Sequence, residues 1–153
     1  MDTQPGLLPS ILDRLTDPES HGTVARAGYS IEQAAKAVQD DLQWLLNTHS
    51  DESDDLKDYP RLGRVLGFGV PDLATLGRLK EIENEGICRL LEDRILKYEP
   101  RLKEVRVSLK QGVKENPLKI ALHLRGLLAM DRAPDFAFDT TLDLASGQFL
   151  GVK

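Results

Sequence analysis

Residues 98–110, YEPRLKEVRVSLK, contain the point at which the hydrophobic pattern of this chain changes its period. Over residues 79–95 the apolar side chains recur at helical spacing, which predicts an amphipathic helix. Glu99-Pro100 ends this helix, because a proline moves the residue before it out of helical geometry. Over residues 105–109 apolar and polar side chains alternate, which predicts a β-strand with one buried face.

The same alternation occurs twice more downstream, over residues 118–125 and 136–144. The connections between the three expected strands are short enough for an antiparallel meander. The helices expected upstream supply apolar faces that match the buried face of the sheet. The sequence therefore predicts an α+β fold in two layers, with amphipathic helices packed on one face of a three-stranded antiparallel sheet.

Another helix is expected to begin at Ser30, because Ser30 and Gln33 have the spacing of a capping box. Its apolar residues share one stripe that should face the core. The stripe comprises Ile31, Ala34, Ala35, Val38, Leu42, Leu45 and Leu46. Trp44 lies off the stripe, so it is either covered by a neighbouring segment or contacts a partner, as interface aromatics often do.

Two short signals precede the helix of residues 79–95. Gly63, Gly67 and Gly69 lie close together but lack the Lys-Ser/Thr of a phosphate-binding loop. They indicate a tight backbone turn, because glycine adopts conformations that other residues avoid. Asp72, directly after Pro71, is a good N-cap and predicts the start of a short helix.

The N-terminal residues carry a separate amphipathic stripe. Five apolar side chains recur at helical spacing from Leu7 to Leu15, and Asp17-Pro18 ends the segment. A helix this short is not stable alone and must dock on another surface. We therefore expect residues 1–18 to be a docking segment and residues 19–153 to be a single domain. Residues 1–6 contain no basic side chain, so no secretory signal is expected.

Composition excludes several classes of function. The net charge of −5 argues against a dedicated nucleic-acid-binding protein, which needs a basic surface. The longest apolar runs are far too short to span a membrane. Cys88 is the only cysteine, so no internal disulfide can form and a reducing, cytoplasmic compartment is expected. The three histidines lack the spacing of a metal site, and no cofactor is expected.

No residue has the setting of a catalytic group. Cys88 lacks the histidine or asparagine motif that activates a nucleophilic cysteine, and His123 is expected on the outward face of a strand. Glu99 is the best carboxylate candidate, but Arg101 beside it favours the ionised form, which is wrong for a general acid. Glu99 and Arg101 are either a recognition element fixed by Pro100 or an internal brace of the corner.

Residues 98–102, Tyr-Glu-Pro-Arg-Leu, resemble the Glu-Pro-Arg core motif of the phage baseplate wedge family that includes the TssE subunits of type VI secretion systems. Residues 8–15, LPSILDRL, resemble the TssE N-terminus more than the phage members. Residues 59–73 are similar to the family's glycine turn, and residues 138–147 are similar to its last strand. Residues 64–69, RVLGFG, depart from the Ser-Val-Leu-Asn-aromatic-Gly that TssE proteins often have there.

The resemblance implies a non-catalytic, cytoplasmic structural subunit of a baseplate that assembles at the inner membrane. The implied partners are the wedge subunits TssF and TssG, with TssK nearby, and the TssB–TssC sheath, whose assembly the subunit would initiate. The family's glutamate and arginine correspond to Glu99 and Arg101. Two alternatives stay open: a soluble adaptor of the same fold that binds a regulator, and a peptidoglycan muramidase.

Partner contacts are expected at the Glu99-Pro100-Arg101 corner, in the N-terminal segment, on the helix that begins at Ser30 and on the first expected strand. The candidate residues are Glu99, Pro100, Arg101, Leu8, Ile11, Leu12, Leu15, Trp44, Arg106 and Lys110. A three-stranded sheet has unpaired backbone groups at its edges, so we expect a sheath strand to add there. The edge in use is either residues 102–110 or residues 136–144. If residues 102–110 are the edge in use, the outward side chains of Arg106 and Lys110 would favour an acidic incoming strand.

Overall fold

A computed structural model of the chain describes residues 30–50, 58–78, 83–110, 116, 118–129 and 134–151. Its helices are α2 (Ile31–Leu46), α3 (Pro60–Leu66), α4 (Leu73–Arg78) and α5 (Asn84–Tyr98). Its strands are β1 (Leu102–Leu109), β2 (Lys119–Leu128), β3 (Asp135–Asp143) and β4 (Gln148–Gly151). The N-terminal stripe, the acidic residues 51–57 and the start of the helix expected over residues 79–95 lie outside the described residues.

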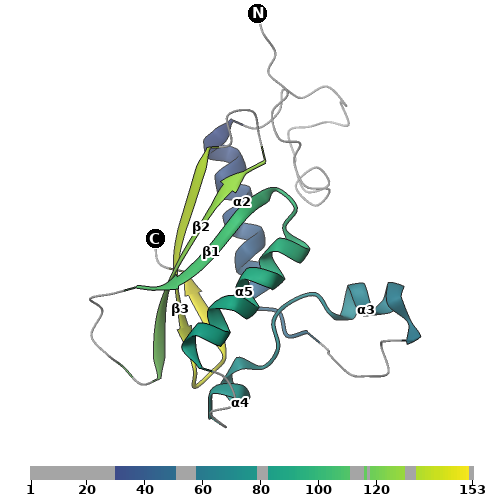
Figure 1. Cartoon of the computed structure of the whole chain (residues 1–153), viewed down its shortest axis with the longest axis vertical. Helices are drawn as coiled ribbons and strands as arrows, with labels where there is room; N and C mark the ends of the chain where they lie inside the picture. The colour runs from purple at the N-terminus through teal and green to yellow at the C-terminus, as the bar shows by residue number, and fades with distance from the viewer. Residues whose placement is uncertain are drawn as a thin grey trace, which may run out of the picture.

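The strands form one antiparallel sheet in the order β1-β2-β3-β4. Helices α2 and α5 lie on the same side of the sheet (Figure 1). Side chains from both helices and from alternate positions of the strands share a single apolar core, since successive strand residues point to opposite faces. The predicted α+β class is confirmed, but the sheet has four strands instead of three.

The unpredicted strand β4 has four residues, of which only Phe149 is buried, so it is too short to display an alternating pattern. Asn47, at the C-terminal end of α2, holds it in place. Asn47 Oδ1 accepts the Phe149 N–H at 2.8 Å, and Asn47 Nδ2 donates to the Phe149 carbonyl at 3.1 Å. Because β4 pairs with residues 140–143, the expectation that residues 136–144 form an open edge is wrong over that stretch.

Strand β1 contains a β-bulge near its start. Its pairing with β2 shifts between Lys103 and Arg106, and Glu104 has a φ of 54°. The extra residue of a bulge changes which side chains face inward. Val105 and Val107 thereby lie on the buried face, as the alternation predicts.

Three apolar residues expected in the core are exposed: Ile31, Leu109 and Leu118. Ile31 is the first residue of α2, Leu109 is the last residue of β1, and Leu118 precedes β2. Positions at the ends of elements extend past the layer that covers their middle, so periodicity overestimates burial there. The other predicted stripe residues of α2 are buried or half-buried.

Two predicted N-caps are confirmed. The Gln33 N–H donates to Ser30 Oγ at 3.2 Å, and the Ser30 N–H donates to Gln33 Oε1 at 3.0 Å. Asp72 Oδ1 accepts from the N–H groups of Ala74 at 3.0 Å and Thr75 at 3.2 Å. Both caps satisfy backbone donors that the first turn of a helix leaves without partners.

The glycine segment forms α3 and then a tight turn that returns the chain to α2. Gly63 lies within α3, so the turn is shorter than expected. Gly69 has a φ of 109°, and a Cβ there would lie 2.1 Å from the Thr48 carbonyl oxygen. Only glycine fits this conformation and this close approach. Across the described ranges, no helix combines the length and the apolar character needed to cross a membrane.

Candidate functional site

The candidate site is the corner where α5 ends and β1 begins. Glu99 is the C-cap of α5, and its N–H donates to the Ile95 carbonyl at 2.8 Å. The Leu102 N–H donates to the Glu99 carbonyl at 3.1 Å, which closes the turn around Pro100. Helix α5 thus ends at the residue that the Glu-Pro sequence predicts.

Glu99 and Arg101 form a buried ion pair inside this corner. Glu99 Oε1 accepts the Arg101 Nε–H at 2.7 Å and the Arg101 backbone N–H at 3.1 Å, while Oε2 accepts from Arg101 Nη2 at 2.6 Å. Paired bonds between a guanidinium and a carboxylate are among the strongest side-chain hydrogen bonds. Glu99 is only 4% exposed, and a carboxylate this buried requires such a partner.

Asp41 of α2 is a third member of this cluster. Arg101 Nη2 also donates to Asp41 Oδ2, which joins segments that are 60 residues apart in the sequence. The hydrogen bonds that Arg101 donates to the carboxylates of Glu99 and Asp41 raise the pKa of Arg101 above its already high usual value, so the guanidinium stays charged. We call Asp41, Glu99 and Arg101 the corner triad; it ties the middle of α2 to the end of α5.

Sequence reasoning missed Asp41. Its one signal is its place beside the apolar stripe of α2, between buried Val38 and buried Leu42. That position predicts partial burial, because residues three and four apart share a helix face. It does not identify the cation that Asp41 binds, because Arg101 is distant in the sequence.

The corner triad is not arranged for acid–base catalysis. A general acid must hold a proton and reach a substrate. Glu99 instead accepts three hydrogen bonds, all from a permanently charged arginine, and is almost inaccessible to solvent. The internal brace considered from the sequence is therefore present, and a recognition role of the same residues stays a prediction.

The corner triad joins segments that carry exposed residues, and we call these residues the corner surface: Pro100, the accessible part of Arg101, Asp41 and Trp44. Pro100 is exposed and Arg101 is half-buried. Trp44 follows Asp41 by three residues, so both lie on the same side of α2. Trp44 is 69% exposed, so the described part of the chain does not cover it. The structure thus joins Pro100-Arg101 to α2 through Asp41, leaves Trp44 exposed three residues further along α2, and buries Glu99.

Arg106 and Lys110 lie away from the corner and already have partners. Arg106 Nη1 is 3.7 Å from Glu92 Oε2. Glu92 Oε1 also accepts the Val107 N–H at 2.8 Å, so a carboxylate of α5 covers part of the β1 edge. A charged side chain at a strand edge discourages pairing with another strand.

On the outer face of the sheet, Asp139 connects β1, β2 and β3. Lys110 Nζ donates to Asp139 Oδ2 at 2.6 Å, and His123 Nδ1 lies 2.5 Å from Asp139 Oδ1. These contacts, with Lys110 the larger cause, hold the pKa of Asp139 below its usual range. His123 is half-exposed on this outer face, where the alternation of β2 predicts it.

The remaining candidate residues contribute no described site. Leu8, Ile11, Leu12 and Leu15 lie outside the described residues. Cys88 is buried in α5, and burial raises the pKa of its thiol, which disfavours the nucleophilic thiolate. No group of three or more histidine, cysteine or acidic residues that could hold a metal ion occurs among the residues that the structure describes.

Comparisons with known proteins bear on the same region. The family model described as "Baseplate wedge protein gp25" matches residues 32–133, from α2 through the corner to the end of β2. A chain in the solved structure described as "The baseplate complex from the type VI secretion system" is similar, with 24% identity and a TM-score of 0.49. The similarity covers 80% of this chain and 96% of that chain. No curated protein matches.

Proposed function

This chain belongs to the baseplate wedge protein gp25 family, and from that premise we propose that it is the TssE-type wedge subunit of a type VI secretion system. The observation that carries the proposal is the family match, which includes the Glu99-Pro100-Arg101 corner. The likeness of residues 8–15 to the TssE N-terminus favours a secretion system over a phage tail. The proposed role is structural, in the cytoplasm, without catalysis and without a cofactor.

In this role the corner surface would contact the wedge subunits TssF and TssG, with TssK nearby. Tryptophan and arginine, here exposed Trp44 and the fixed Arg101, are the residue types that most often contribute most of the affinity of an interface. The corner triad supports such a contact because it holds Arg101 in one orientation, which lowers the entropy that binding must remove. The N-terminal segment of residues 1–18 is proposed as a second contact with the same subunits.

The contact with the TssB–TssC sheath is assigned to the β1 edge. At β4 the edge groups of Phe149 are both bound by Asn47, which leaves little room for another strand. At β1, Glu92 binds the backbone N–H of Val107, and exposed Leu109 lies beyond it. An incoming sheath strand would pair with the end of β1 at Leu109, by the strand addition that open edges permit.

The test is complementation of a strain that lacks this gene, with fluorescent TssB as the readout of sheath assembly. We expect the wild-type gene and the control Leu150→Ala, an exposed position on β4, to restore sheaths. We expect Trp44→Ala to reduce sheath assembly strongly while leaving the purified protein folded. The proposal is wrong if sheaths assemble without the gene, or if the purified protein binds neither TssF nor TssG. Hydrolysis of peptidoglycan by the purified protein would support the muramidase alternative instead.

A further inference from the structure

Helix α3 exposes an apolar stripe. Leu62, Val65 and Leu66 have the i, i+3, i+4 spacing of one helix face, and none of the seven residues of α3 is buried. Val65 is 71% exposed, and Tyr59, directly before the helix, is also exposed. Seven residues are far too few for a helix that is stable alone in water. An exposed apolar patch of this kind marks a site of contact with another molecule.

The end of α3 is fixed to α5, so the stripe is held in a defined position. Arg94 Nη1 of α5 donates to the Gly67 carbonyl at 3.2 Å. The rings of Phe68 and Tyr98 pack edge to face, with centroids 5.4 Å apart. Figure 1 shows α3 projecting away from the sheet and the two longer helices. The helix is therefore an anchored projection and not part of the core.

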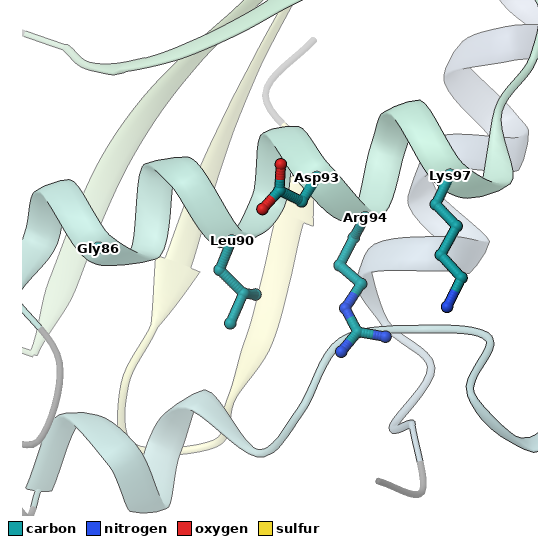
Figure 2. A pocket seen from close by; sticks show the side chains of 5 residues that line it. All are labelled: Gly86, Leu90, Asp93, Arg94 and Lys97. Atoms are coloured by element: carbon teal, nitrogen blue, oxygen red, sulfur yellow. The ribbon is translucent and has the colours of Figure 1, made fainter. Parts of the chain in front are cut away.

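The adjacent face of α5 is hollowed. A cavity of about 470 Å³ is lined by Gly86, Leu90, Asp93, Arg94 and Lys97. Figure 2 shows Leu90, Arg94 and Lys97 projecting to the same side of α5. At 1.5 Å per residue, the lining from Gly86 to Lys97 extends over roughly 16 Å of the helix. A groove of this length along a helix suits another helix better than a compact small molecule.

The charges around these apolar residues are mostly positive. Arg61 and Arg64 are exposed on α3, and Lys97 is exposed on α5. Arg94 also lines the groove, and Asp93 is its one acidic lining residue. This basic rim belongs to a chain with a net charge of −5. Charges at the rim of an interface select partners of the opposite sign and speed their association.

We propose that α3 and the groove face of α5, together named the α3–α5 surface, bind an acidic amphipathic helix of another subunit. The apolar stripe of that helix would cover Leu62, Val65 and Leu66. Its flanking carboxylates would pair with Arg61, Arg64 and Lys97. The inference rests on the proposed function, since the helix would belong to one of the wedge subunits.

The direct test is photo-crosslinking in the wedge complex reconstituted from the full chain, TssF and TssG. The photoreactive residue p-benzoylphenylalanine replaces Val65, and in the matched control it replaces the exposed Leu150 of β4. We expect position 65 to crosslink to one segment of a wedge subunit that is net acidic and has apolar residues at helical spacing. We expect the control position not to reach that segment.

Several crosslinking outcomes would overturn the inference. They are capture of a basic or strand-like segment, of a second copy of this chain, or of residues 1–29 or 51–57 of the same chain. Absence of any crosslink above the control would also overturn it. Each outcome is read in a complex that has already formed, so it leaves the proposed function standing.

A second measurement tests the charges. The variant Arg61→Glu with Arg64→Glu should bind the wedge subunits at least tenfold more weakly than the wild type at about 0.1 M salt. The difference in affinity between variant and wild type should become smaller at higher salt, because salt screens the charges of the rim. The control Lys36→Glu with Lys119→Glu makes the same change of charge at exposed positions on α2 and β2, away from the α3–α5 surface, and should bind normally. Normal binding by the first variant would overturn the inference. Failure of the wild type to bind would instead reject the proposed function.

Discussion

The corner triad and α3 reverse the usual distribution of side chains in a small domain. The corner triad places an ion pair in the interior, with Glu99 only 4% exposed. Helix α3 places leucine and valine in solvent, with Val65 71% exposed. The buried charges have partners at short distance, which offsets much of their desolvation. The exposed apolar residues have no such compensation within the described part of the chain. The buried triad therefore stabilises the subunit and orients Arg101, whereas the exposed apolar residues of α3 can contribute only to contacts.

A turn over residues 67–69 attaches α3 to α2 and α5, the helices that hold the corner triad. Gly67 is bound by Arg94 of α5, and Gly69 packs against Thr48 at the end of α2. The turn fixes the direction in which α3 projects, and no residue of α3 itself is buried. Rigidity of an exposed element lowers the entropic cost of binding, because less freedom is lost on association.

The largest effect is expected at the corner. Glu99→Ala leaves the Arg101 guanidinium half-buried without its main partner, and breaking a buried ion pair costs about 3–5 kcal/mol. Urea unfolding of the purified variant should therefore show a large loss in the free energy of unfolding. The double variant Glu99→Ala with Arg101→Met removes both charges, so its loss in the free energy of unfolding should be smaller than that of Glu99→Ala alone. A loss below about 1 kcal/mol in Glu99→Ala would remove the contrast between the two regions.

The next effect is expected at the turn that attaches α3. Gly69→Ala forces a side chain into a positive φ and against the Thr48 carbonyl oxygen, and should cost about 3 kcal/mol. Gly147→Ala is the matched control, because Gly147 also has a positive φ but its added Cβ would meet no atom closer than 3.5 Å. The control should cost about 1 kcal/mol. Equal losses in thermal unfolding would show that the contact with α2 is unimportant.

A smaller, pH-dependent effect is expected on the outer face of the sheet. The lowered pKa of Asp139 means that its ionised form favours folding above the usual value near 3.9, and this contribution is lost as the pH falls through the folded value. Asp139→Asn should thus cost under about 1 kcal/mol at neutral pH, as is usual for half-exposed pairs. The cost should disappear once the pH has fallen below the lowered folded pKa of Asp139, where the carboxyl is protonated. A cost that grows on acidification would contradict the assignment.

The smallest effect on stability is expected in α3. Val65→Ser changes an exposed side chain that touches no core residue, so the free energy of unfolding should change by less than about 0.5 kcal/mol. The same variant should weaken binding to the wedge subunits. A clear loss in melting temperature would mean that α3 packs against the fold, and the comparison with the corner would fail.

Much of the fold follows from periodicity. The capping box, the Asp72 cap, the helix end at Glu99-Pro100 and most inward residues of the three longer strands were predicted, although buried Leu128 lies past the predicted second strand. Strand β4 was not, because only Phe149 among its four residues is buried and its pairing depends on Asn47. Exposed Leu109 and Leu118 were expected in the core because periodicity carries no information on where the covering layer ends.

Less of the candidate site could be predicted. Adjacent Glu99 and Arg101 were correctly identified as a pair, because their spacing around Pro100 is local. The contribution of Asp41 depends on a contact across 60 residues of sequence, which no local pattern specifies. Helix α3 itself was not predicted, because the glycines at positions 63, 67 and 69 were interpreted as a tight backbone turn.

Hydrogen exchange of the free protein and of the protein in the complex with TssF and TssG tests the central claim most directly. Residues 95–102, around the corner triad, should already be protected in the free protein, because the amides of Glu99 and Leu102 are hydrogen-bonded there, so contact with the wedge subunits should add only a little further protection. Residues 59–68, which include α3, should exchange rapidly in the free protein and become protected in the complex. Protection gained at the corner with none at residues 59–68 would contradict the account.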